Sequence, residues 1–486
     1  MQRKCGLMLH ISSLPNKYGF GCFSKDAYDF IDFLKKSGQH YWQVLPFNPT
    51  NNSGSPFQCY SVFAGNPNFI DLTEFLNEKE LSKLNIKPTT EINFKELTET
   101  RINALKFIFD RDYKKYDLEE FKKQNDFWLQ DYAVFMALKD FYNGVEYTRF
   151  PEALKKYDKK AVKEFSEQHK TEVEFHIFVQ YLFLQQWTKI KNYANENGIE
   201  IIGDIAFYPA TDSSDTWANR ENFCIDEECK PTGIAGVPPD YFSADGQLWG
   251  NPVYNVKKMK KDKYIWWVKR FQQAHKFYDI VRLDHFRGFE SFWMCKPKAK
   301  TAKGGKWVKS FGLDLFKELK KHRVPGFIAE DLGVITKPVK DLMKKCGFPG
   351  MKVFQFAFDG DPKNAYYPHN YTEDCVAYIG THDNNTFVGF LQEEPNETLK
   401  MVKEYLSLPD ESTYEQITDL SLAVMLNSLA QTVIFTVQDI LKLDQNYRMN
   451  IPGTPENNWK FVLPQGLLTD ELAQNLRNLT IAANRI

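Results

Sequence analysis

Short apolar runs alternate along the chain with longer stretches of helical periodicity. Within residues 25–36, for example, Ala27, Phe30, Ile31 and Leu34 recur at the spacing of one helix face. Eight apolar runs have the length of buried strands: 6–11, 41–46, 199–204, 280–284, 326–330, 351–358, 376–379 and 432–437. Eight such runs separated by helical stretches predict parallel strands that close into a (β/α)₈ barrel, because both faces of each strand are buried there.

One long helical stretch interrupts this alternation. Between residues 94 and 197 the only proline is Pro151, and apolar residues such as Ile177, Tyr181 and Leu184 recur with helical period. We therefore expect an α/β fold in which residues 1–486 form a single (β/α)₈ TIM barrel domain. A mostly helical insertion, residues 94–197, would separate its second and third strands. Loop subdomains would decorate the C-terminal face.

Composition narrows the kind of partner. A net charge of -1 gives no electrostatic reason to expect nucleic acid or an anionic membrane, and no apolar run is long enough to span a bilayer. Eight scattered cysteines without C-x-x-C pairs favour reduced thiols over a disulfide framework or a zinc site. We expect a cytoplasmic protein whose partner is a neutral molecule. Aromatic residues, 15% of the chain, suit a core or stacking on sugar faces.

Several apolar runs end at or shortly before a polar residue. These residues are His10, Asp204, Asp284, Glu330 and Asp383. In a (β/α)₈ barrel the active site lies at the carboxyl ends of the strands, so these side chains are expected to converge there. The alternation of the fourth run also places Arg282 and Asp284 on one face of the sheet.

The Arg282–Asp284 pair has two interpretations. A fixed positive charge lowers the pKa of a neighbouring carboxyl by about 1–3 units, which would keep Asp284 ionised as a nucleophile requires. A buried structural ion pair explains the same stretch. Two further acids favour chemistry, because one ionised and one protonated carboxyl suffice to cleave a glycosidic bond. Glu330 is the candidate acid, and Asp383 can bind the sugar hydroxyl beside the anomeric carbon.

The pattern R-x-D, then E, then H-D resembles that of the α-amylase clan. The surrounding stretches resemble one branch, the 4-α-glucanotransferases (amylomaltase or disproportionating enzyme, glycoside hydrolase family 77). Eleven stretches match in the family's order across nearly the full chain: 7–15, 41–46, 63–67, 201–205, 235–243, 246–252, 282–289, 329–336, 350–358, 381–386 and 449–454.

The resemblance implies roles for individual residues. Asp284 would be the nucleophile, Glu330 the acid/base, Asp383 the transition-state stabiliser, and Arg282 the support of the nucleophile. A loop bearing Gln247 and Trp249 would close over the donor glucan. Further substrate contacts are implied for Ser55, Phe57, Asp204, His285, Phe356, His382 and Asn450.

Three of these assignments have an ordinary alternative. Trp249 can be a core tryptophan, although Gly246, Gly250 and Pro252 around it favour a loop. His285 and His382 adjoin acids, which hints at metal binding, but hydrogen bonding to sugar is favoured, and we expect no metal and no cofactor. Phe57 stands where the family usually has tyrosine, so ring stacking is retained without the phenol hydroxyl.

The function implied is a retaining transfer of α-1,4-glucan segments from a donor maltooligosaccharide to the 4-hydroxyl of an acceptor. One alternative is an α-glucan hydrolase of the same clan. The 49 residues after Val437 are too few for the C-terminal β-sandwich of roughly 100 residues that amylases usually add. The other alternative is a catalytically silent glucan-binding protein, but the three acids and Arg282 speak against it. Maltooligosaccharides and α-1,4-glucans are the expected partners, and a monomer or weak homo-oligomer the expected state.

Overall fold

The computed structural model describes residues 2–51, 53–86, 89, 92–239, 243–324, 326–454 and 457–486. Residues 240–242, part of the matching stretch 235–243, lie outside this description. No helix within the described ranges is both long enough and apolar enough to cross a membrane.

Eight parallel strands form the centre of the described chain. They are β1 (Lys4–Met8), β2 (Tyr41–Gln43), β3 (Glu200–Ile205), β6 (Ile280–Leu283), β9 (Phe327–Ala329), β10 (Gly350–Val353), β11 (Cys375–Tyr378) and β12 (Thr432–Thr436). Their order is β10-β11-β12-β1-β2-β3-β6-β9. Ala329 N–H donates to the carbonyl of Pro349 at 2.9 Å, which brings the two ends of this order together into a nearly closed barrel. The (β/α)₈ prediction is confirmed, and each predicted run overlaps one strand.

The predicted strand edges need correction at two places. The first strand begins at Lys4 and ends at Met8, so the apolar residues Leu9 and Ile11 belong to the segment that follows it. The run 351–358 is extended only to Val353 and then tightens into a 3₁₀ turn, Phe354–Phe356. Both errors arise because a buried loop at the rim of a barrel is as apolar as a strand.

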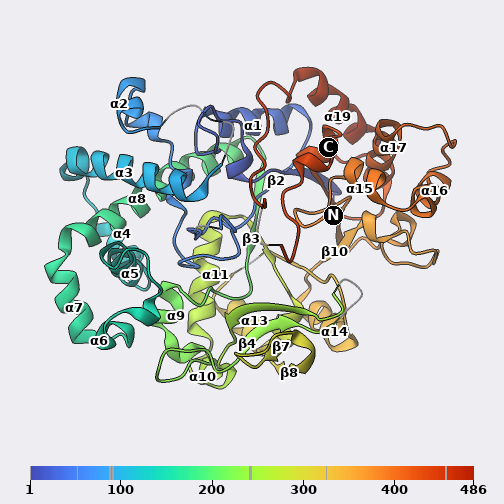
Figure 1. Cartoon of the computed structure of the whole chain (residues 1–486). Coiled ribbons are helices and arrows are strands. Elements are labelled where there is room, and N and C mark those ends of the chain that lie inside the picture. Colours follow the sequence, from blue (N-terminus) through green and yellow to red (C-terminus); the bar gives the residue numbers. More distant parts are fainter. Residues whose placement is uncertain are drawn as a thin grey trace.

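Helices surround the barrel and fill the insertion. They are α1 (Lys25–Lys36), α2 (Glu78–Lys83), α3 (Phe94–Asp112), α4 (Glu119–Gln124), α5 (Leu129–Phe141), α6 (Glu152–Lys155), α7 (Lys159–Gln168), α8 (Lys170–Glu196), α9 (Ser214–Ala218), α10 (Val256–Lys261), α11 (Ile265–Phe277), α12 (Arg287–Glu290), α13 (Gly312–Lys321), α14 (Lys337–Cys346), α15 (Phe387–Glu393), α16 (Asn396–Tyr405), α17 (Tyr414–Asn427), α18 (Val437–Ile440) and α19 (Asp470–Ala482). In α1 the four apolar residues of the predicted face are buried, and Ser24 caps the helix by accepting from Asp26 N–H. The helices α3 to α8 occupy the predicted insertion between β2 and β3 (Figure 1).

A smaller antiparallel sheet lies beside the barrel. Its strands are β4 (Ile234–Val237), β5 (Gln247–Pro252), β7 (Ser291–Cys295) and β8 (Lys306–Lys309), in the order β5-β4-β7-β8. Gln247 and Trp249 therefore lie in a strand, and the prediction of a loop for them was wrong. Gly246 and Gly250 have positive φ values of 66° and 78°, and the β4–β5 register shifts, so the glycines mark a bulged strand.

Candidate active site

An arginine and two aspartates form the buried floor of the site. Asp204 on β3 and Arg282 on β6 are register partners, and Arg282 Nη1 donates to Asp204 Oδ2 at 2.6 Å. The same Nη1 donates to Asp284 Oδ1 at 3.2 Å, directly after β6. The predicted Arg282–Asp284 contact is therefore present. The side chain of Arg282 is 4% exposed and that of Asp284 is 28% exposed, so Asp284 is the member of this group that faces open space.

Glu330 follows β9, the strand next to β6. His285 N–H donates to Glu330 Oε2 at 2.8 Å, and Leu332 N–H donates to Oε1 at 2.7 Å. His285 adopts the left-handed conformation with φ 49°, which turns the chain just after Asp284. Two backbone donors from two different strand ends thus fix the orientation of this carboxyl group next to Asp284.

Asp383 lies in the segment after β11 and is held by residues of the segment after β12. Asn450 Nδ2 donates to Asp383 Oδ1 at 2.6 Å, and His382 Nε2 lies 3.5 Å from Oδ2. Arg448 donates to the backbone carbonyl oxygens of Asp383 and Asn450, at 2.8 and 2.7 Å. The Asp383 side chain nevertheless remains 46% exposed, which leaves it accessible to a ligand.

Burial and mutual repulsion govern the titration of the acids. Burial raises the pKa of Asp284 well above its usual value; Arg282 opposes this, and Asp204, Glu330 and Asp383 add to it. Burial also raises the pKa of Glu330, against the effect of Arg282. Arg282 does lower the pKa of Asp284, as predicted, but burial and the neighbouring acids raise it by more. Among the described residues Arg282 forms an ion pair with Asp284 and none with Glu330, so a negative charge shared by the two acids is best stabilised on Asp284.

Aromatic rings line two sides of the acids. Phe57 stacks on the His382 ring with centroids 5.4 Å apart and planes 14° apart, and Trp459 lies 5.8 Å from Phe57. On the other side the Trp249 ring contacts the edge of His285 at 4.9 Å, and its Nε1 donates to Gln247 Oε1 at 3.2 Å. Burial lowers the pKa of His382, and it lowers that of His285 to about 4, so both imidazoles are neutral at pH 7.

The remaining predicted residues lie next to this group. Ser55 Oγ accepts from Phe57 N–H at 3.3 Å and so orders the turn that carries the ring. Phe356 contacts Tyr366 at 5.6 Å, and burial together with Asp331 and Glu330 raises the pKa of Tyr366 to about 12. Phe356 therefore lies next to Tyr366, which is close to Glu330. The contacts of the other predicted residues are described above.

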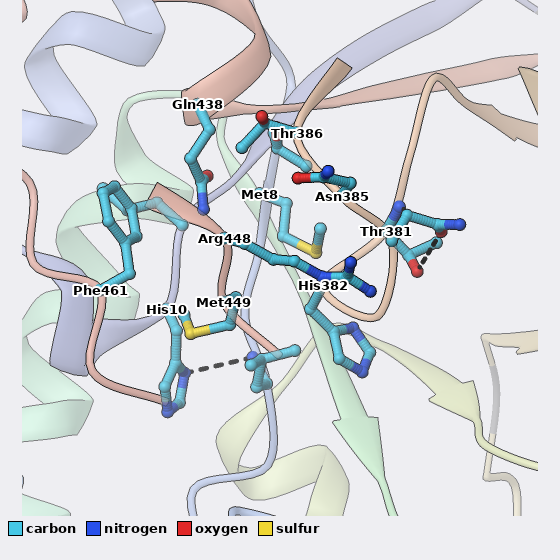
Figure 2. Close-up of a pocket in the computed structure, with 14 residues that line it drawn as sticks. Met8, His10, Thr381, His382, Asn385, Thr386, Gln438, Arg448, Met449 and Phe461 are labelled. Carbon is cyan, nitrogen blue, oxygen red and sulfur yellow. Dashed lines mark hydrogen bonds between the residues drawn. The ribbon is translucent and has the colours of Figure 1, made fainter. Parts of the chain in front are cut away.

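A pocket opens where β1, β11 and β12 end. Its lining includes His10, His382, Gln438, Arg448 and Phe461, all of which are labelled in Figure 2. His10 Nδ1 accepts from Leu45 N–H at 3.2 Å, and burial lowers the pKa of His10 to about 3. The pocket therefore presents neutral imidazoles together with the Arg448 guanidinium beside the His382 and Asp383 segment.

Sequence reasoning missed two residues that shape the site, Arg448 and Trp459. Arg448 directly precedes the matching stretch 449–454, and this position was its only signal. Trp459 has φ 66° and donates its N–H to the Met449 carbonyl at 2.7 Å, which holds the ring near Phe57. Its ring partner Phe57 lies near the other end of the chain, so no local pattern predicts this contact.

The chemistry of this arrangement is that of paired carboxyl groups. Within the described residues no group of three or more His, Cys, Asp or Glu has the arrangement of a metal site. One acid contacts a guanidinium, another is oriented by backbone N–H groups, and a third is exposed beside a neutral imidazole. Aromatic walls around such acids suit a neutral ligand with apolar faces and hydroxyl edges.

Comparison with known proteins gives one consistent relationship. A family model described as 4-alpha-glucanotransferase, glycoside hydrolase family 77, matches residues 9–467. The 4-alpha-glucanotransferase of Streptococcus pneumoniae serotype 4 is 40% identical over 497 residues, which cover 100% of this chain and 98% of that protein. The 4-alpha-glucanotransferase of Thermus thermophilus is 40% identical over 501 residues, and the match covers 100% of both. Among solved structures, amylomaltase from Streptococcus agalactiae in complex with acarbose matches with a TM-score of 0.94 and 34% identity over 100% of both chains.

Proposed function

Because this chain belongs to the 4-alpha-glucanotransferase family, glycoside hydrolase family 77, we propose that Asp284, Glu330 and Asp383 transfer α-1,4-glucan segments by a retaining double displacement. One observation carries this proposal. Asp284 is hydrogen-bonded to Arg282, and Glu330 is held beside Asp284, at the carboxyl ends of adjacent strands. The donor is a maltooligosaccharide, and the acceptor is the 4-hydroxyl of a second sugar chain.

In the first displacement Asp284 attacks the anomeric carbon while Glu330 donates its proton to the leaving glycosidic oxygen. Arg282 stabilises the charge on Asp284, and the raised pKa of Glu330 keeps its proton available. Asp383 accepts a hydrogen bond from the hydroxyl beside the anomeric carbon, and this bond strengthens as positive charge develops there. The reducing-end fragment leaves, and a β-glycosyl ester of Asp284 remains.

In the second displacement the roles reverse. Glu330, now ionised, takes the proton from the acceptor 4-hydroxyl, and the oxygen attacks the anomeric carbon and releases Asp284. Two inversions restore the α configuration. Water can perform the same attack, so transfer requires that an acceptor ring occupies the site between the Trp249 and Phe57 walls and excludes water.

Pure maltotriose tests the proposal directly. We expect a ladder of longer maltooligosaccharides together with free glucose, separated by size and assayed enzymatically. Asp284→Asn should abolish both, because an amide cannot form the glycosyl ester. Maltose and glucose without longer chains would indicate the hydrolase, and unchanged maltotriose with the wild-type protein would contradict catalysis and favour a glucan-binding protein.

The setting of this activity is part of the proposal. All eight cysteines are free, which suits reduced thiols in the cytoplasm. The near-neutral charge suits a neutral polysaccharide over nucleic acid or a membrane. We assign residues 1–486 to one catalytic domain, with 94–197 as an insertion in it, working as a monomer or weak homo-oligomer.

A further inference from the structure

One guanidinium bonds to the backbone on both sides of the hydrogen bond that orients Asp383. The Asn450 amide donates to Asp383 Oδ1 at 2.6 Å. Arg448 Nη2 donates to the Asp383 carbonyl oxygen at 2.8 Å, and Arg448 Nε donates to the Asn450 carbonyl oxygen at 2.7 Å. The three residues thus form a closed ring of hydrogen bonds, in which Arg448 sets how far apart the two backbones lie.

The turn that carries Asp383 is ordered by bonds of its own. Thr381 N–H donates to Asn384 Oδ1 at 2.9 Å, and Asn384 N–H donates to the Thr381 carbonyl oxygen at 3.2 Å. Asp383 N–H donates to Thr381 Oγ1 at 3.3 Å. These bonds fix the shape of the turn, but they do not attach it to the segment after β12.

The segment after β12 is also ordered by bonds that do not involve the guanidinium. Ile451 N–H donates to Asn458 Oδ1 at 2.8 Å, and Trp459 N–H donates to the Met449 carbonyl oxygen at 2.7 Å. Both segments therefore have bonds that hold their own shape. What Arg448 adds is a connection from one segment to the other, at the residue that carries the carboxylate.

The acceptors of Arg448 are neutral, so its geometry matters as well as its charge. The side chain is half-buried on the wall of the pocket in Figure 2. Among the described residues it forms no ion pair with a carboxylate, and its hydrogen bonds go to two carbonyl oxygens. A guanidinium presents its N–H groups in one rigid plane, which fixes the directions of both bonds. A lysine would supply the charge without this fork.

We propose that Arg448 is a positioning residue for glucan transfer, which holds the Asp383 carboxylate where it receives the hydroxyl beside the anomeric carbon. This inference rests on the proposed function, because Arg448 acts through Asp383 and does not touch the sugar. The bond from that hydroxyl to Asp383 strengthens as positive charge develops, so a displaced carboxylate costs most in the transition state. The loss of Arg448 therefore affects kcat more than KM.

Arg448→Ala tests this role with maltotriose as the donor. We expect kcat for transfer to fall by about tenfold to a hundredfold, the cost of a small misplacement, while KM changes much less. Guanidinium ion, far below denaturing concentrations, should restore part of kcat, whereas ammonium ion should not. Arg448→Lys keeps the charge and should also lose kcat. Wild-type activity in either variant would overturn the proposal, and so would equal rescue by both ions.

Arg3→Ala is the matched control. Arg3 also donates to two backbone carbonyl oxygens, those of Ser428 and Ala483, at 2.8 and 2.6 Å, and it makes no contact with the acids. This variant loses bonds of the same kind at a distant place. It should keep the wild-type kcat and should not respond to guanidinium. A loss of kcat equal to that of Arg448→Ala would show a general effect of lost bonds and would overturn the positioning role.

A donor without the hydroxyl that Asp383 binds separates positioning from a merely structural role. The loss of rate caused by Arg448→Ala should be large with α-maltosyl fluoride. It should nearly disappear with the analogue that lacks the 2-hydroxyl beside the anomeric carbon. Both comparisons use the same two protein preparations, so partial unfolding of the variant lowers both rates equally. An equal loss with the two donors would overturn the proposal.

Crystal structures of the wild-type and Arg448→Ala proteins read the position of the carboxylate without any activity. We expect the Asp383 carboxylate to move away from the Asn450 amide in the variant, and an unchanged Asp383 would overturn the proposal. Failure of the proposed function is seen separately, because the wild-type protein would then form no longer chains from maltotriose.

Discussion

Arg282 is shared between two carboxylates, and this sharing affects how Asp284 titrates. Asp204 is the nearer partner, at 2.6 Å against 3.2 Å, and its charge adds to the burial that raises the pKa of Asp284. Asp204→Asn removes that charge and leaves Arg282 to Asp284, so the pKa of Asp284 falls. Asp284 must be ionised to attack, and activity is lost as pH falls through its pKa. We expect the acid limb of the kcat/KM profile to move to lower pH by about one unit.

Asp331→Asn is the matched variant for the alkaline limb of the kcat/KM profile. Asp331 raises the pKa of Glu330 and is not among the largest contributors to the raised pKa of Asp284. Glu330 must be protonated, and activity is lost as pH rises through its pKa, so lowering this pKa moves the alkaline limb to lower pH. The same shift of the same limb in both variants would contradict the assignment of Asp284 and Glu330 to separate roles.

Glu330→Gln separates proton donation from nucleophilic attack. The amide has no proton to donate to a sugar leaving group, and transfer from maltotriose should fall by about 10²–10⁴-fold. α-Maltosyl fluoride needs little protonation of its leaving group, so its first displacement should fall much less. The glycosyl ester of Asp284 should then accumulate and appear as a mass increase in the intact protein. An equal loss with both donors, without a mass increase, would remove Glu330 from the acid role.

At the scale of elements, a buried carboxyl joins the ends of two barrel strands. Asp439 follows β12, and its Oδ1 accepts from Phe387 N–H at 2.7 Å, at the start of α15. Burial raises the pKa of Asp439 to about 6. The folded protein therefore keeps a proton that the unfolded chain releases, and the free energy of unfolding should decrease from about pH 4 to pH 6, by about 3 kcal/mol from this group.

Asp439→Asn should remove this pH dependence, because the amide accepts the same N–H bond and does not ionise. The measurement is the urea midpoint at pH 4.5 and pH 7 for both proteins. The variant should lose less stability than the wild type over this interval. Asp419→Asn, at an exposed carboxyl of α17 that pairs with Lys442, is the control and should leave the wild-type difference unchanged. Parallel curves for wild type and Asp439→Asn would contradict the assignment.

Elements buried on both faces could be predicted from the sequence, and those that depend on distant contacts could not. The barrel strands appear as apolar runs because parallel strands pack on both sides. The strand β5 was missed because local sequence rules predict a turn at Gly246 and Gly250. In the fold, pairing with β4 keeps the chain between these glycines extended. The positions of Asp284 and Glu330 follow from the ends of their runs. The raised pKa of Glu330 follows from its role as the acid, but the raised pKa of Asp284 does not follow from the sequence, because burial depends on the whole fold.

The site residues that the sequence did not reveal were missed for the same reason, because they depend on distant contacts. Residues attached to strand ends, such as Arg282 and Asp383, were found because the barrel brings all strand ends to one face. Arg448 and Trp459 reach that face on an irregular segment after β12, and their contacts with Asp383 and Phe57 span long sequence separations. Recognising them requires the folded chain.

At the scale of the whole molecule, one buried arginine joins the first strand to the last helices. The Arg485 guanidinium is fully buried and donates to five backbone carbonyls: those of Lys4, Leu426, Ser428, Ala430 and Gln431, at 2.6 to 3.3 Å. It thus connects β1 with the α17–β12 turn, in the region where Gln2 Nε2 donates to the Ile486 carbonyl and the two ends of the chain lie near each other in Figure 1.

Arg485→Lys should destabilise the protein although it keeps the charge. An ammonium has three donors on a single nitrogen and cannot reproduce a planar fork that reaches five acceptors, so buried carbonyls are left without partners. We expect a loss of about 2–4 kcal/mol in the free energy of unfolding, measured by urea denaturation. Arg477→Lys, at a half-buried position of α19, is the matched control and should change stability by less than about 0.5 kcal/mol.

Because Arg485 lies far along the chain from the acids and contacts none of them, transfer from maltotriose by the folded variant should stay near the wild-type rate. An unchanged urea midpoint would show that the five bonds contribute little, and lost transfer at full stability would place Arg485 in a different role.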